Sequence, residues 1–196
     1  MGVTDTATVL VLPGYQNSGP AHWQSHWEQE HPAYLRVEQE DWDAPQLDSW
    51  VATLDRAVAL APPGPVVLVA HSLGCITVAH WATRQEQLAG QVSDGQVIGR
   101  QVIGALLVAP ADIDTVDIAE LKNFRPVPLR PLPFPSIVVS SSNDPYADPE
   151  RSRLFAESWG SRLVALGSLG HINSDSAMGS WPEGQALLAE LLATAG

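Results

Sequence analysis

The sequence predicts an α/β fold, with a mostly parallel sheet of about six strands and helices on both faces. Short apolar runs alternate along the chain with longer segments of helical periodicity, which is typical of repeated strand–helix units. The 196 residues are enough to bury a core, and we expect one domain spanning residues 1–196. We expect strands at 8–12, 34–39, 66–70, 103–109, 136–141 and 162–166, and helices at 20–30, 46–60, 73–87, 148–158 and 183–194.

Individual segments support these assignments. The apolar run that ends at Leu12 is broken by Pro13, so it indicates a first strand. Val66–Val69 has three β-branched residues in four, as in a buried strand. Asp148-Pro149-Glu150 is typical of a helix start, because proline suits the first helical position. Five prolines between 126 and 135 prevent a long helix there, so we expect no large lid domain and an open or thinly covered site.

Ser72 lies between the expected strand 66–70 and the helix that follows it. The residues two before and two after it, Ala70 and Gly74, are small, so strand and helix can approach closely around a sharp turn. This arrangement is typical of a nucleophile elbow, usually written G-x-S-x-G, which holds the serine oxygen clear of the backbone. The alternative is that Ser72 is only a helix N-cap.

A serine nucleophile needs a base, and the base needs a group that orients it. In chains with a nucleophile elbow the order is serine, acid, histidine. Asp144 follows the expected strand 136–141, although it could instead form an Asx turn or a cap. Asp148 is a rival acid that we interpret as the helix start. His171 follows a glycine-bearing loop past the last strand, where the base belongs.

Backbone N–H groups are expected to stabilise the oxyanion. One donor is the N–H of Leu73, the residue after the nucleophile, and the other is the Tyr15 N–H, with Gln16 as second choice. The alternative is that the proline–glycine pair before Tyr15 is merely a turn. We expect Gln16, His22 and His71 to border the substrate pocket.

His22 and His26 are four residues apart in an expected helix, which is a spacing that a metal site can use. The segment has no H-E-x-x-H pattern and no clear third ligand, so we interpret these histidines as a polar face and predict no metal and no cofactor. Trp23 and Trp27 in the same segment are predicted to be core residues.

The composition of the chain argues against some binding partners and for a particular cellular location. The formal net charge of −12 opposes binding to nucleic acid or anionic membranes. No apolar run approaches the roughly 20 residues that span a bilayer, and no secretory signal is visible. The single cysteine, Cys75, fits a reducing cytoplasm and is expected to be a buried small residue. Oligomeric state is left open.

Two further features of the sequence are an acidic segment and a short repeat. Four acidic residues follow the expected strand 103–109, namely Asp112, Asp114, Asp117 and Glu120. They are interpreted as a solvated acidic helix face, with a weaker hypothesis that they disfavour anionic substrates. The repeat of Gln-Val-Ile-Gly at 96–99 and 101–104 indicates a local duplication that lengthens a loop.

With these residues identified, the chain resembles the α/β-hydrolase superfamily and, more narrowly, the small serine hydrolases related to retinoblastoma-binding protein 9. The resemblance spans nearly the whole chain. It departs at Asp175–Met178, where small residues are expected. The motifs that carry it are Leu12-Pro13-Gly14-Tyr15, His22-Trp23, Asp41-Trp42 with Pro45, His71-Ser72-Leu73-Gly74, Asn143-Asp144-Pro145-Tyr146, Trp159-Gly160-Ser161, Gly170-His171-Ile172-Asn173 and Trp181-Pro182-Glu183-Gly184.

The resemblance implies a triad of Ser72, Asp144 and His171 and hydrolysis without a cofactor. Family substrates are poorly defined, with ester, amide and aminopeptidase activities suggested, so we expect a small-molecule or short-peptide substrate. The competing hypothesis is a catalytically silent protein-binding module that keeps the fold.

Overall fold

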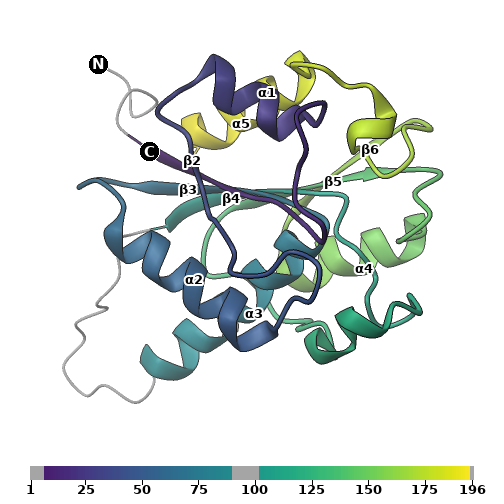
Figure 1. The fold of residues 1–196 in the computed structure, drawn as a ribbon, viewed down its shortest axis with the longest axis horizontal. Helices are drawn as coiled ribbons and strands as arrows, with labels where there is room; N and C mark the ends of the chain where they lie inside the picture. The colour runs from purple at the N-terminus through teal and green to yellow at the C-terminus, as the bar shows by residue number, and fades with distance from the viewer. Residues whose placement is uncertain (1–6, 90–101, 195–196) are drawn as a thin grey trace.

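Six parallel strands form one sheet at the centre of the structure, a computed structural model that describes residues 7–89 and 102–194 (Figure 1). The strand order is β2-β1-β3-β4-β5-β6, and each neighbouring pair is parallel. The α/β prediction is therefore confirmed. The strands are β1 (Thr8–Leu12), β2 (Leu35–Arg36), β3 (Val66–His71), β4 (Val102–Val108), β5 (Ser136–Ser141) and β6 (Arg162–Leu166).

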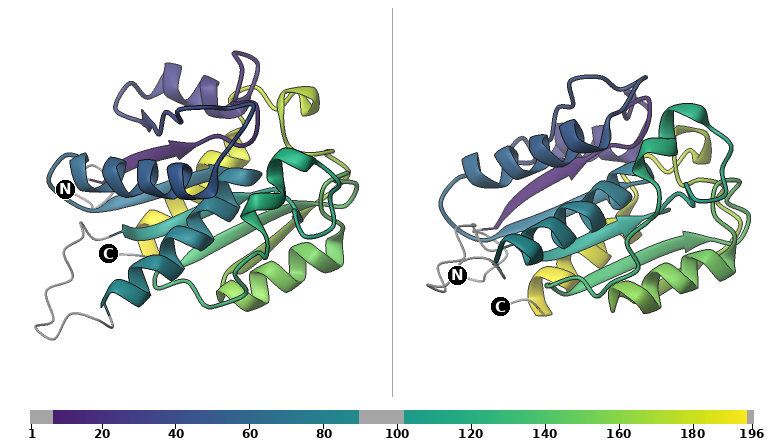
Figure 2. Two further views of the ribbon diagram at one scale, coloured as in Figure 1. Left: turned by 60° about the horizontal axis from the view of Figure 1, so that its bottom comes forward. Right: turned by 90° about the horizontal axis from the view of Figure 1, so that it is seen from below.

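Helices cover both faces of the sheet (Figures 1 and 2). On one face lie α1 (Trp23–Glu30) and α5 (Pro182–Thr194), and on the other lie α2 (Leu47–Leu60), α3 (Leu73–Ala89) and α4 (Pro149–Trp159). Alternate strand residues face the two layers: Val67 and Val69 pack with the first pair, whereas Leu68 and Ala70 pack with the second set. Each face of the sheet therefore has its own apolar core.

The loops that leave the carboxyl ends of the strands meet at one edge of the sheet, because all the strands run the same way. In open parallel sheets this edge is where ligands bind. The segments after β1, β3, β5 and β6 carry the residues that the sequence singled out, and each of these strands ends within a few residues of its candidate.

Some boundaries differ from the expectation. The expected strand 34–39 is reduced to two residues, Leu35–Arg36, and the expected helix 20–30 begins at Trp23 with His22 as its N-cap. The segment between β4 and β5 contains only a short 3-10 helix, η2 (Ala119–Phe124), so no large lid is present there. The first Gln-Val-Ile-Gly copy lies outside the described residues. Within the described part, no helix has both the length and the apolar character to cross a membrane.

Candidate active site

The turn between β3 and α3 brings Ser72 to the carboxyl edge of the sheet. Ser72 has φ 54°, a left-handed conformation that is uncommon for a residue with a side chain. A Cβ on Gly74 would lie 2.5 Å from the Leu12 carbonyl oxygen and 2.8 Å from that of Pro13, so only glycine fits at this position. The close packing expected around the elbow is therefore present.

Three side chains from separate loops meet at this turn. His171 Nε2 lies 2.8 Å from Ser72 Oγ. On the other side of the ring, Nδ1 lies 2.9 Å from each carboxylate oxygen of Asp144. The side chains of His171 and Asp144 are only 7% and 3% exposed, so these hydrogen bonds are shielded from water. The rival acid, Asp148, is the N-cap of α4 and accepts the Arg151 N–H, as its helix-start pattern predicted.

Asn143 ties the loop that carries the acid to the loop that carries the histidine. Its Oδ1 accepts the Gly170 N–H at 2.7 Å and the Ser141 hydroxyl at 2.9 Å. The Ser141 Oγ in turn accepts the Leu169 N–H at 2.9 Å. No role for Asn143 in linking the loops was expected from the sequence, because its partner lies 27 positions further along the chain.

The His171 loop is also held from behind by two ring N–H groups. His71 Nε2 lies 2.9 Å from the His171 carbonyl oxygen. Since a carbonyl can only accept, this nitrogen carries the proton. Trp23 Nε1 donates to the Ile172 carbonyl at 2.9 Å. Trp23 is fully buried, as predicted, but its hydrogen bond to this loop had no signal in the sequence.

His22 and His71 both line the hollow that also contains Ser72. Their rings lie 4.7 Å apart, and the His71 ring lies 4.8 Å from that of His171. Burial, reinforced by the positive charges of Arg36, His171 and His26, lowers the pKa of His22 to about 3. Burial likewise holds the pKa of His71 well below its usual range. Both rings are therefore neutral near pH 7.

The hydrogen bond that His22 accepts fixes which of its two ring nitrogens carries the proton. Its Nδ1 accepts the Gln24 backbone N–H at 3.2 Å, so the proton sits on Nε2. That Nε2 is buried and has no hydrogen-bond partner among the residues the structure describes. His22 therefore caps α1 through one nitrogen and presents an unsatisfied donor on the other.

The loop after β1 packs directly against the elbow. A Cβ on Gly14 would lie 2.8 Å from Ser72 Cβ and 3.2 Å from the Leu73 nitrogen. The Gln16 N–H donates to the Trp42 carbonyl at 3.0 Å, so this second-choice donor is occupied. The Tyr15 N–H and the Leu73 N–H donate to no acceptor within residues 7–89 and 102–194. Neither group therefore has a backbone partner in the described part of the chain.

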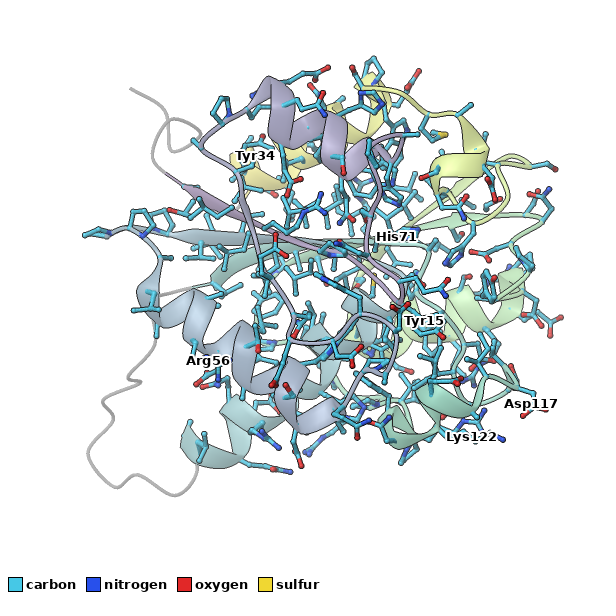
Figure 3. The ribbon with its side chains drawn as sticks, in the orientation of Figure 1. Tyr15, Tyr34, Arg56, His71, Asp117 and Lys122 are labelled. Atoms are coloured by element: carbon cyan, nitrogen blue, oxygen red, sulfur yellow. The ribbon has the colours of Figure 1, made fainter. Side chains whose placement is uncertain are left out.

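Gln24 braces the two strands that support this loop and the nucleophile. Its side chain is fully buried. Its Nε2 donates to the Leu12 and Val69 carbonyls, at 3.2 Å each, and its Oε1 accepts the Ser18 hydroxyl at 2.6 Å. Figure 3 shows Tyr15 and His71 near each other, at the edge of the sheet where these strands end.

A hollow of about 320 Å³ opens over these groups, and we call it the inner hollow. Ser72 and His171 lie in it together with Tyr15, Gln16 and His22. An apolar wall completes it, made by Ala111, Val116, Ile118 and Leu121. The hollow therefore combines a serine hydroxyl hydrogen-bonded to a histidine with an apolar surface of limited size.

The acidic residues after β4 do not form the expected solvated helix face. Asp112 is only 2% exposed, and both it and Asp114 pair with Arg151 of α4, at 2.6 and 3.1 Å. Asp117 pairs with Lys122 at 2.9 Å. Arg151 lies far along the sequence, so charge counting within one segment could not find these pairs.

Tyr15, which lines the inner hollow, lies within electrostatic reach of two carboxylates. Desolvation, together with the nearby charges of Glu120 and Asp43, raises the pKa of Tyr15. Cys75 is fully buried behind the elbow, as predicted, and burial raises the pKa of its thiol. No group of three potential metal ligands occurs within the described residues.

Comparisons with known proteins agree with this architecture. The sequence pattern of the serine hydrolase family matches residues 9–190. A solved structure described as a YdeN-like hydrolase, from Pectobacterium atrosepticum, is 32% identical, with 98% of this chain and 94% of that chain covered and a TM-score of 0.81. Among curated proteins no sequence matches this chain significantly.

Two more distant structures share the fold. The ydeN gene product of B. subtilis is 18% identical, with 95% of this chain and 98% of that chain covered and a TM-score of 0.71. Est1E from Butyrivibrio proteoclasticus, solved with ferulic acid bound, is 13% identical, with 96% and 90% covered and a TM-score of 0.67. The family match covers most of the chain, and the sheet, the elbow and these neighbours agree with it. The chain therefore belongs to the serine hydrolase family.

Proposed function

We propose that this protein hydrolyses small carboxylic esters, thioesters or amides through an acyl-enzyme formed on Ser72. The observation that carries the proposal is the pair of hydrogen bonds at His171, 2.8 Å to Ser72 Oγ and 2.9 Å to the Asp144 carboxylate. This geometry supports a base that touches the nucleophile and is itself oriented by an acid.

The steps follow from these contacts. His171 Nε2 takes the hydroxyl proton as Ser72 Oγ attacks the substrate carbonyl, and Asp144 stabilises the imidazolium that forms. The Tyr15 and Leu73 N–H groups stabilise the negative oxygen. His171 then gives the proton to the leaving oxygen, sulfur or nitrogen as the bond to it breaks. A water molecule, deprotonated in the same way, releases the acid and restores Ser72.

The shape of the site supports a modest substrate. The inner hollow of about 320 Å³ and its apolar wall suit a short acyl chain. The segment between β4 and β5 has no large lid, which supports small soluble or peptide-like substrates over lipid droplets. Kinship with the family of retinoblastoma-binding protein 9 belongs to this proposal and rests on the ordered motifs from Leu12 to Gly184.

The proposal also covers the location of the protein in the cell and its binding partners. One cysteine, Cys75, supports a cytoplasmic location, and the net charge of −12 supports a role without nucleic-acid or membrane partners. Cell fractionation tests the location, and a DNA- or vesicle-binding assay at low salt tests the partners.

A fluorophosphonate probe separates the enzyme from a silent module. We expect covalent labelling of Ser72, and loss of both labelling and ester turnover in Ser72→Ala with an unchanged circular dichroism spectrum. Ser142→Ala is the matched control, since Ser142 is exposed on the neighbouring loop. Absence of labelling in folded protein, or an unchanged rate in Ser72→Ala, would reject the enzyme. A panel of p-nitrophenyl esters and aminoacyl amides then ranks the substrate classes.

A further inference from the structure

A second hollow, of about 450 Å³, adjoins the inner hollow, and we call it the outer hollow. The two share Tyr146, His171 and Asn173 in their linings. The outer hollow also includes Ser168, Gly170 and Asp175. The proposed mechanism so far gives it no role.

The chemistry of the triad distinguishes the two hollows. The nucleophile and the apolar wall both lie in the inner hollow, so the acyl group belongs there. The leaving atom must come within hydrogen-bond reach of His171, because this ring returns the proton to it. The outer hollow shares His171 with the inner hollow, so it is the adjoining space for the rest of the leaving group.

The lining of the outer hollow is suited to positive charge. Asp175 is exposed, and its carboxylate forms no ion pair with any of the described residues. Tyr146 is 38% exposed, and its ring lies edge-on to that of His171 with centroids 4.6 Å apart. Among the residues that the structure describes, no lysine or arginine lines either hollow. A carboxylate and an exposed aromatic ring that line one hollow attract an ammonium group, and the carboxylate repels an anion.

We propose that the outer hollow binds the leaving group and that Asp175 and Tyr146 select a cationic one, such as an ammonium-bearing alcohol or thiol. This inference rests on the proposed function and adds a substrate class to it. It also gives a role to Asp175, where the sequence departs from the small residues of the family it resembles.

A matched pair of thioesters tests the proposal. Acetylthiocholine and 3,3-dimethylbutyl thioacetate have the same acyl group, and their thiols differ only in a quaternary nitrogen in place of a carbon. Water cleaves each to acetate and a free thiol, which a disulfide dye detects. We expect kcat/KM to be about three- to tenfold higher for the cation at low ionic strength. The preference should shrink at 0.5 M salt, because exposed charges are screened.

Variants identify the source of the preference. Asp175→Asn should bring the two kcat/KM values within about twofold, because the carboxylate that attracts the cation is lost. Glu157→Gln changes the net charge equally. Glu157 lies near the carboxyl end of α4, shortly before β6 begins, and it lines neither hollow, so the preference should remain. Tyr146→Phe should keep the preference and Tyr146→Leu should reduce it.

The outcomes separate this inference from the proposed function. Ser72-dependent cleavage of both thioesters with equal kcat/KM, or a preference that survives Asp175→Asn, would overturn the outer hollow's role and leave the hydrolase intact. Wild-type protein that reacts with fluorophosphonate at Ser72 yet cleaves neither thioester would overturn it as well. Failure of Ser72 to label would instead overturn the proposed function.

Discussion

The contact between Gly14 and the nucleophile makes a single methyl group a sensitive probe of the oxyanion loop. In Gly14→Ala the new Cβ would lie 2.8 Å from Ser72 Cβ and 3.1 Å from the His71 carbonyl oxygen. Two carbon atoms normally sit about 3.5–4.0 Å apart, so the loop or the serine must move by roughly 1 Å. Both possible movements alter the same site, because the loop carries the Tyr15 N–H.

The expected losses of stability and of kcat follow from this displacement. Overpacking of this kind lowers the free energy of unfolding by about 1–3 kcal/mol. A misplacement of about 1 Å, or the loss of one oxyanion donor, lowers kcat by about 100-fold or more. Ground-state binding should change less than kcat, because the donor acts on charge that develops in the transition state. We therefore expect a large fall in kcat with a small change in KM.

The assay compares kcat and KM for a p-nitrophenyl ester, with urea unfolding as the measure of stability. Gly19→Ala is the matched control on the same loop: a Cβ there meets nothing within 4 Å. It should keep both activity and stability. If Gly14→Ala retained a kcat within about threefold of wild type while folded, the packing of this loop against the elbow would not set the oxyanion geometry.

Three further predictions concern groups around the triad. Asp144→Asn should lower kcat by about 10³–10⁴-fold with little change in stability, because the catalytic imidazole loses its orienting acid; ester turnover and urea unfolding check this. Trp23→Phe removes the donor to the Ile172 carbonyl, so unfolding free energy should fall by about 1–3 kcal/mol and kcat should fall with it. His22→Asn, which keeps a capping oxygen, should reduce the loss of stability between pH 7 and pH 5 relative to wild type; urea unfolding at both pH values, with His26→Asn as control, measures this.

The direction of the pH effect follows from proton linkage. The pKa of His22 is about 3 in the folded protein, against an ordinary value near 6.5. Between these values the unfolded chain binds a proton that the folded chain does not, so stability falls as the pH falls below 6.5. At pH 5 this amounts to about 2 kcal/mol. Equal pH dependence in wild type and His22→Asn would contradict the buried, neutral assignment.

The sequence was sufficient for the residues whose position depends on strand order. Ser72, Asp144 and His171 could be assigned because each follows a strand of a parallel sheet, and the carboxyl ends of such strands meet. Strands β1 and β3 and most of β4 were clear because they are buried on both faces and therefore almost continuously apolar. The two-residue strand Leu35–Arg36 was overestimated, since an edge strand pairs on one side only and its length depends on its single neighbour.

Contacts between residues that lie far apart in the sequence could not be predicted in this way. The indole of Trp23 and the carbonyl of Ile172 are 149 positions apart, and neither local composition nor periodicity records such a pair. The same holds for Asn143, which links two loops, and for the ion pair between Asp112 and Arg151. The sequence shows that these side chains are polar, but the hydrogen-bond or ion-pair partner of each one depends on the tertiary structure.

Helix α1 and its N-cap make several such long-range contacts around the site. Trp23 holds the loop of the base, Gln24 holds the ends of β1 and β3, and His22 packs against His71 beside the nucleophile. These are three consecutive residues, so one short helix fixes the relative positions of the base, the oxyanion loop and the elbow. The sequence indicated only that this helix has a polar face and a tryptophan core, whereas in the structure it links the loops that carry His171, Tyr15 and Ser72.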